Sequence, residues 1–247
     1  MERIYVKPQF KLRQELTLPK DRRYRNEDSY QSSDRRGIYA LSDGASISYD
    51  SASWARILVR RFAQFPVVDD QWLDGAVADF QRLHNRDSMT WMQQAAFDRG
   101  SFASLLGVRY AMDTETIHIF AIGDSLAVLC DGNEIKATFP YQSQDQFDSP
   151  PQLLSTNKPK NSFLSEAIQN SKLVVDWPLK GLAAPSLFCV TDALGRWLLE
   201  RQNETPSPII LLRKIVEGGR KQFTNFVRSE RAAKRMRLDD TTMLALW

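Results

Sequence analysis

The sequence predicts an α+β domain, because the spacing of apolar residues changes from a helical to a strand-like period partway along the chain. Two long stretches with helical spacing, 51–65 and about 70–98, come first. From Gly100 onward the pattern is that of strands, at 101–110, 116–122, 126–130 and 134–139. The dipeptide Asp131-Gly132 between the last two is the strongest short signal for a β-hairpin.

The helical stretches each present one apolar face. In the first, Trp54, Leu58 and Phe62 share a face, and Pro66 marks the end. The second is expected to break near 85–88. A further long helix begins at Pro208 and ends in the basic run 228–237, which is typical of a solvated helix face.

Length and composition indicate one globular domain spanning 1–247, with about 140–172 as a flap or insertion. The chain is 43% hydrophobic and 26% charged, which is ordinary for a soluble protein. The net charge of +3 is spread along the chain, so nucleic acid is not an expected partner. Cys130 and Cys189 lie in apolar runs and are expected as buried thiols in a reducing compartment, the cytoplasm. No run is long and apolar enough to predict a membrane span, and we expect a monomer.

The stretch 37–44 predicts a functional carboxylate. The apolar run 38–41 reads as a buried strand, and Asp43-Gly44 follows it as a turn. A carboxylate at the end of a buried strand is held rigidly, and a glycine without a Cβ allows its own carbonyl to approach a ligand closely. An aspartate beside a predicted strand end recurs at Asp124, at Asp192 and at the pair Asp239-Asp240.

A further acidic pair, Glu27-Asp28, follows an arginine-rich stretch. Arginines there suit an anion, while the two carboxylates suit a cation. An all-oxygen set favours Mg²⁺ or Mn²⁺, and two Cys with two His offer no convincing zinc spacing. Two such ions can bind a phosphate and lower the pKa of a bridging water. No Walker loop or dinucleotide-binding glycine pattern is present.

Six short motifs in order resemble the metal-dependent protein phosphatase family, type 2C. They are Arg23-x-x-Asn26-Glu27-Asp28, Leu41-Ser42-Asp43-Gly44, Gly100-Ser101-Phe102-Ala103, Ile122-Gly123-Asp124-Ser125, Val190-Thr191-Asp192 and Asp239-Asp240-x-Thr242. The resemblance covers 23–247. It implies a four-layer α-β-β-α sandwich, with two antiparallel sheets flanked by helices.

The resemblance also implies roles for these residues. Asp43 would bridge two Mg²⁺ or Mn²⁺ ions, with Asp192 and Asp239 completing the ligands of the first and the Gly44 carbonyl binding the second. The remaining residues matched to the family's metal-binding positions are Glu27 and Asp28, acting through metal-bound waters, and Asp124, associated with a third, weaker ion. Arg23 matches the phosphate-binding arginine. A metal-bridging water would attack the phosphorus of phosphoserine or phosphothreonine in a protein substrate, and the enzyme would oppose a Ser/Thr kinase.

The chain departs from the family pattern in two places. The loop after Asp43-Gly44 is Ala45-Ser46-Ile47-Ser48, without the histidine that some members carry. Arg196 stands four residues after Asp192, where many members have another aspartate, which puts the third ion in question. A positive charge there supports an alternative, a weak or inactive phosphatase-like module used for regulatory binding. Nucleic-acid binding through 228–237 is a third, less favoured hypothesis.

Overall fold

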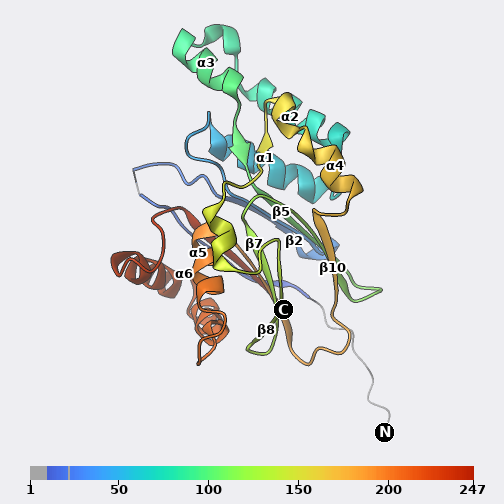
Figure 1. Cartoon of the computed structure of the whole chain (residues 1–247), viewed down its shortest axis with the longest axis vertical. Coiled ribbons are helices and arrows are strands. Elements are labelled where there is room, and N and C mark those ends of the chain that lie inside the picture. The colour runs from blue at the N-terminus through green and yellow to red at the C-terminus, as the bar shows by residue number, and fades with distance from the viewer. Residues whose placement is uncertain (1–9, 22) are drawn as a thin grey trace.

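Two five-stranded sheets form the centre of the molecule (Figure 1). In the computed structural model, which describes residues 10–21 and 23–247, the first sheet has the order β1-β12-β11-β7-β8 and the second β10-β6-β5-β3-β2. The strands of the first sheet are β1 (Leu12–Leu18), β12 (Thr241–Leu246), β11 (Pro185–Val190), β7 (Leu126–Asp131) and β8 (Glu134–Phe139). Those of the second are β10 (Val174–Pro178), β6 (Thr116–Ile122), β5 (Leu105–Ala111), β3 (Ile38–Ser42) and β2 (Ser29–Ser33). Every paired strand in them is antiparallel.

The two sheets pack face to face through one apolar layer. Tyr39 and Ile119 of the second sheet and Leu129 and Leu244 of the first belong to the same buried cluster. The strand alternation explains this layer, because every second side chain of each strand points inward. The position of His118 between Ile117 and Ile119 predicts that it faces outward, and its Nδ1 indeed lies 2.7 Å from Asp176 Oδ1 at the surface.

Helices cover both outer faces and complete the four layers that the resemblance implies (Figure 1). On the second sheet lie α1 (Ser51–Gln64), α2 (Asp70–Leu83) and α4 (Phe163–Gln169), and on the first lie α5 (Asp192–Glu200) and α6 (Pro208–Ala232). Trp54, Leu58 and Phe62 bury the inner face of α1, as their spacing predicts. The expected break after α2 is confirmed by a short turn and a separate helix, α3 (Trp91–Arg99), which projects from the body of the molecule.

Several elements differ from the sequence prediction. The polar strand β2 and the edge strand β10 were not predicted. The run 101–110 is divided into β4 (Phe102–Ala103) and β5, and α6 contains Gly219 at φ 64°, so its two halves meet at a kink. The sequence also predicts a short strand at 4–6, which lies outside the described residues.

The segment 140–172 carries short elements of its own. These are the 3₁₀ turns η3 (Gln144–Asp148) and η4 (Lys158–Asn161), the strand β9 (Leu154–Ser155), which pairs with β4, and α4. Phe147, Leu154 and Leu164 are buried in the clusters beneath. Within the described part of the chain, no helix is long and apolar enough to span a bilayer.

Candidate functional site

The predicted acidic residues gather at one end of the two sheets because the strands that carry them are antiparallel neighbours. Ser29 pairs with Ser42 at the β2–β3 edge, which brings the residue before β2, Asp28, beside the residue after β3, Asp43. In the other sheet the Thr191 amide donates to the Thr242 carbonyl at 3.1 Å. The end of β11 and the start of β12 therefore meet at the same place.

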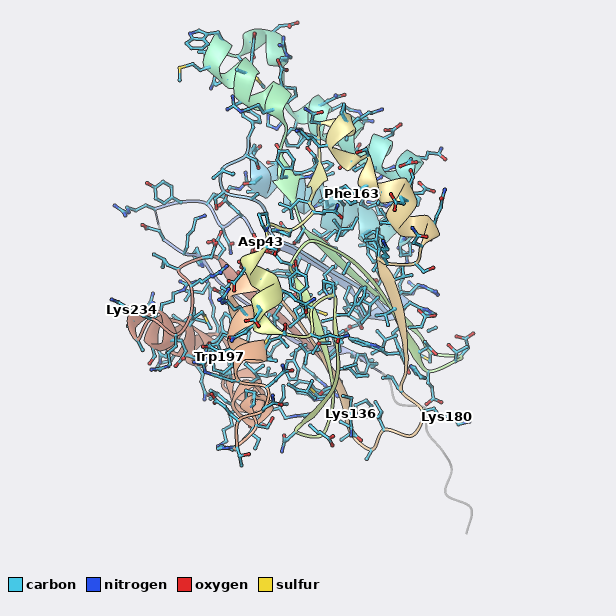
Figure 2. All side chains as sticks on the ribbon, in the orientation of Figure 1. Asp43, Lys136, Phe163, Lys180, Trp197 and Lys234 are labelled. Carbon is cyan, nitrogen blue, oxygen red and sulfur yellow. The ribbon has the colours of Figure 1, made fainter. Side chains whose placement is uncertain are left out.

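The backbone of Asp43 is fixed by Ser104. The Asp43 amide donates to Ser104 Oγ at 2.9 Å, and the Ser104 amide donates to the Asp43 carbonyl at 2.8 Å. Ser104 Oγ also hydrogen-bonds Ser125 Oγ at 2.8 Å, next to Asp124. Figure 2 places Asp43 near the middle of the molecule, between the helices of the second sheet and Trp197 of α5.

Gly44 is required by packing. A Cβ built on it would lie 2.9 Å from the backbone carbonyl carbon and oxygen of Ser51, in the first turn of α1. Real Cβ atoms do not approach backbone atoms so closely. The absence of a side chain thus lets α1 begin directly against the Asp43-Gly44 turn.

Asp28 is a buried carboxylate with one unsatisfied oxygen. Asp28 as a whole residue is only 9% exposed. Oδ2 accepts hydrogen bonds from the hydroxyls of Thr242 at 2.6 Å and Thr191 at 3.2 Å. Oδ1 is buried and has no hydrogen-bond partner among the described residues. A buried oxygen left in this way indicates a place for a ligand.

Mutual repulsion and burial disfavour the charged forms of these carboxylates. Burial first, and then the charges of Asp28, Asp192, Asp124 and Asp239, raise the pKa of Asp43 well above its usual value. Burial, with Asp124 and Asp239, raises the pKa of Asp192 to about 7. The pKa values of Asp28 and Asp124 are also raised, in both cases chiefly by burial. The structure therefore brings together the predicted aspartates from distant parts of the chain.

Asp240 has a structural role. Its Oδ1 accepts from the Lys20 amide and its Oδ2 from the Glu27 amide, both at 2.6 Å. One carboxylate thus holds the whole 20–27 segment against the start of β12. Burial acts to raise the pKa of Glu27, but hydrogen bonds from Lys20, Ser46 and Ser51 outweigh it and lower that pKa.

Arg23 lies apart from the carboxylates that sequence analysis assigns to metals. Its side chain is 80% exposed, and its Nη2 is 2.6 Å from Asp21 Oδ2. Arg25 Nη1 lies 3.4 Å from Asp50 Oδ1. Arg22 lies outside the described residues.

Two cations near the acidic cluster, Lys20 and Arg237, were missed by sequence analysis. Burial raises the pKa of both Asp124 and Asp192, and the charge of Arg237 acts against that rise, which places this charge near them. Arg237 Nη2 is 3.5 Å from Asp148 Oδ1. Arg196 lies 2.5 Å from the same oxygen. Lys20 contacts Glu27 and Asp239. No spacing rule identifies such partners, because most of the paired residues lie far apart in the sequence.

Within residues 10–21 and 23–247, no group of three or more His, Cys, Asp or Glu side chains stands ready to hold a metal ion. Carboxylates repel one another at short range, which opposes a tight ligand shell built from these side chains.

Comparison with known proteins supports the fold independently. No protein-family model matches the chain, and no curated protein matches it either. Solved structures do match. A bacterial serine phosphatase superposes with a TM-score of 0.58 at 15% identity, covering 94% of this chain and 96% of that chain.

Two further solved structures give the same result. The photosystem II phosphatase PBCP has a TM-score of 0.57 at 16% identity, covering 96% of this chain and 98% of its own. The catalytic domain of the serine/threonine protein phosphatase PstP, in complex with two manganese ions, has a TM-score of 0.54 at 13% identity, covering 96% and 97%. The chain therefore has the fold of the serine/threonine phosphatases whose motifs it resembles.

Proposed function

We propose that this protein is a divalent-cation-dependent phosphatase acting on phosphoserine and phosphothreonine in proteins. The observation that carries the proposal is the convergence of buried aspartates at one end of the sheets, with Asp28 Oδ1 left without a partner among the described residues. The fold shared with serine/threonine phosphatases supports the same reaction class.

The donor set fits Mg²⁺ or Mn²⁺. Carboxylate and carbonyl oxygens are the ligands these hard cations prefer, and a cation relieves the repulsion that raises the aspartate pKa values. In this proposal the ions would be held by Asp43, Asp192, Asp239 and the Gly44 carbonyl. Bound there, the ions would neutralise phosphate charge and supply a water of lowered pKa as nucleophile. The similar phosphatase PstP is described with two manganese ions.

The other acidic residues have supporting roles in the proposal. Glu27 and Asp28 would act through water bound to the ions, and Asp124 would contribute to a third, weaker position. Arg196 stands where many family members have another aspartate, and its Nη1 pairs with Asp148 Oδ1, so the proposal treats two ions as the working centre.

Arg23 is proposed to bind the substrate phosphate. Its guanidinium already donates to both oxygens of the Asp21 carboxylate, through Nε at 3.2 Å to Oδ1 and Nη2 at 2.6 Å to Oδ2. A phosphate offers the same geometry. The side chain is 80% exposed, so a phosphate can compete with the Asp21 carboxylate for the guanidinium. The substrate would be a phosphoprotein, and the enzyme would act as a monomer against a Ser/Thr kinase.

The second candidate is a phosphatase-like binding module without turnover. The exposed, Asp21-paired Arg23 and the cations around the aspartates favour it. Hydrolysis of p-nitrophenyl phosphate in millimolar Mn²⁺ distinguishes the two candidates. The phosphatase proposal expects metal-dependent turnover that Asp43→Asn abolishes, whereas turnover that is absent, or equal in the two proteins, supports the binding module.

A further inference from the structure

The ammonium group of Lys20 lies among the acidic side chains assigned to the metals. Its Nζ is 2.5 Å from Glu27 Oε2 and 3.7 Å from Asp239 Oδ1. It also donates a hydrogen bond to Ser46 Oγ, in the loop that follows Asp43-Gly44. A single cation of the chain thus contacts a carboxylate from each of two separate loops.

The position of Lys20 is fixed both at its backbone amide and at its side-chain ammonium. Its amide donates to Asp240 Oδ1 at 2.6 Å, and the other oxygen of that carboxylate accepts from the Glu27 amide. The Lys20 side chain is only 23% exposed, and that of Glu27 only 15%. An unrestrained surface lysine keeps its ammonium in water, so this restraint argues for a role in the cluster.

Glu27 is fully engaged by donors of the chain itself. Ser51 Oγ donates to Oε1 at 2.5 Å, and Ser46 Oγ donates to Oε2 at 2.5 Å, beside Lys20 Nζ. Ser46 belongs to the loop whose sequence departs from the family pattern. Ser46, Ser51 and Lys20 therefore all donate to the Glu27 carboxylate. The proposed function assigns this same carboxylate to the metal centre.

We propose that Lys20 is a resident cation that competes with a divalent ion for the Glu27–Asp239 side of the cluster. This inference rests on the proposed metal centre. In the absence of metal, the ammonium offsets part of the repulsion between the carboxylates and stabilises the fold. For metal to bind, the ammonium must leave or tolerate a second cation within a few Å, which lowers the affinity.

The competition sets the metal concentration at which the centre fills. A positive charge held next to the ligands raises the dissociation constant for every cation that enters, because like charges repel in a partly buried site. Removal of that charge is expected to tighten Mn²⁺ binding by about tenfold or more. It is also expected to lower the melting temperature of the metal-free protein, because the carboxylates then lack their counter-ion.

The test compares Lys20→Gln, Lys20→Met and Lys20→Arg with the wild type. Mn²⁺ affinity is measured by isothermal titration, and the melting temperature is measured in EDTA and in millimolar Mn²⁺. We expect tighter binding and a larger Mn²⁺-induced shift for the Gln and Met variants, with Arg close to wild type because it keeps the charge. Lys136→Gln is the matched control, since Lys136 pairs with Glu134 and lies well away from Asp43 in Figure 2.

The outcomes separate this inference from the proposed function. If wild type binds Mn²⁺ in a manner that Asp43→Asn abolishes, but the Gln and Met variants bind no more tightly, Lys20 is not a competitor and the metal centre stands. If no variant binds Mn²⁺, both the metal centre and the competition are wrong. Equal tightening by Lys136→Gln would show a general charge effect and would also overturn the inference.

Discussion

Thr242 donates its hydroxyl proton to Asp28 Oδ2 at 2.6 Å, although the two residues are 214 positions apart in the sequence. The bond joins the start of the second sheet to the last strand of the first. Thr191 binds the same oxygen, and its own Oγ1 accepts from the Thr242 amide at 2.9 Å. The acidic cluster therefore depends on contacts between the first and last parts of the described chain.

Replacement of Thr242 by valine tests this contact. Valine keeps the shape but removes a hydroxyl donor from a buried carboxylate, and we expect a loss of about 1–3 kcal/mol in the free energy of unfolding. Urea denaturation in EDTA measures it. Thr116→Val is the control, because its hydroxyl makes an exposed 3.2 Å bond to Thr114 and should matter little. If the two variants lose the same free energy of unfolding, the Thr242–Asp28 bond has no special role in stability.

The metal-free protein is expected to become less stable as the pH rises. The folded-state pKa of Asp192 is about 7, and those of Asp28 and Asp43 are raised, whereas an unfolded aspartate titrates near about 3.9. The folded state therefore holds protons that the unfolded state has released. The stabilisation from these protons is complete below about pH 4 and is lost as the pH rises through about 7.

Melting temperatures in EDTA from pH 5 to pH 8 measure this loss, which should be smaller in Asp192→Asn. With Mn²⁺ present the trend should reverse, because the metal competes with protons for the same oxygens and gives its largest shift at pH 8. A melting temperature in EDTA that stays level or rises over this range would contradict the raised pKa values of these aspartates.

Gly44→Ala is expected to disturb the site by packing alone. The new Cβ would meet the Ser51 backbone at 2.9 Å, so the Asp43 turn and the start of α1 must separate, at about 1–3 kcal/mol. We expect a lower melting temperature and a weaker Mn²⁺ shift. Gly75→Ala in α2 is the contrast, because the nearest atoms to its Cβ belong to the Arg61 guanidinium, the far end of a long side chain, and not to backbone. A Gly44→Ala protein as stable and as metal-responsive as wild type would refute this reading of Gly44.

Arg23→Ala separates phosphate binding from metal binding. Loss of a charged, paired hydrogen bond to phosphate should lower kcat/KM by about ten- to a hundredfold, while the Mn²⁺-induced rise in melting temperature is unchanged. Arg25→Ala is the internal control, because Arg25 Nη1 bonds to Asp50 and Ser53 near the start of α1. If both variants lose activity equally, loop charge explains the effect and Arg23 has no specific role.

The sequence was informative wherever the signal was local. The apolar run before Asp43, the Asp131-Gly132 hairpin and the one-sided helix around Leu58 each rest on neighbours a few residues away, and each is present in the structure. β2 was missed because Ser29-Tyr30-Gln31-Ser32-Ser33 lacks apolar alternation. It is a strand because β3 supplies its hydrogen bonds.

The cations of the site were not predictable, because their contacts join residues that are far apart in the sequence. Lys20 precedes Asp239 by most of the chain, and nothing in the spacing of either residue identifies the other as its partner. Arg237 reads as part of a solvated basic run until the fold places its charge beside Asp124 and Asp192. The motifs identified the carboxylates, but the balance of charge around them depends on tertiary structure.

The proposed function depends on two divalent ions held by Asp43, Asp192, Asp239 and the Gly44 carbonyl. The most direct measurement is a crystal structure of the protein soaked in Mn²⁺, with the ions located by their anomalous scattering. We predict two manganese peaks beside the Asp43 carboxylate, one of them also bound by Asp192 and Asp239 and the other by the Gly44 carbonyl. An absence of peaks at Asp43, with the aspartates unmoved and Lys20 still on Glu27, would contradict the claim.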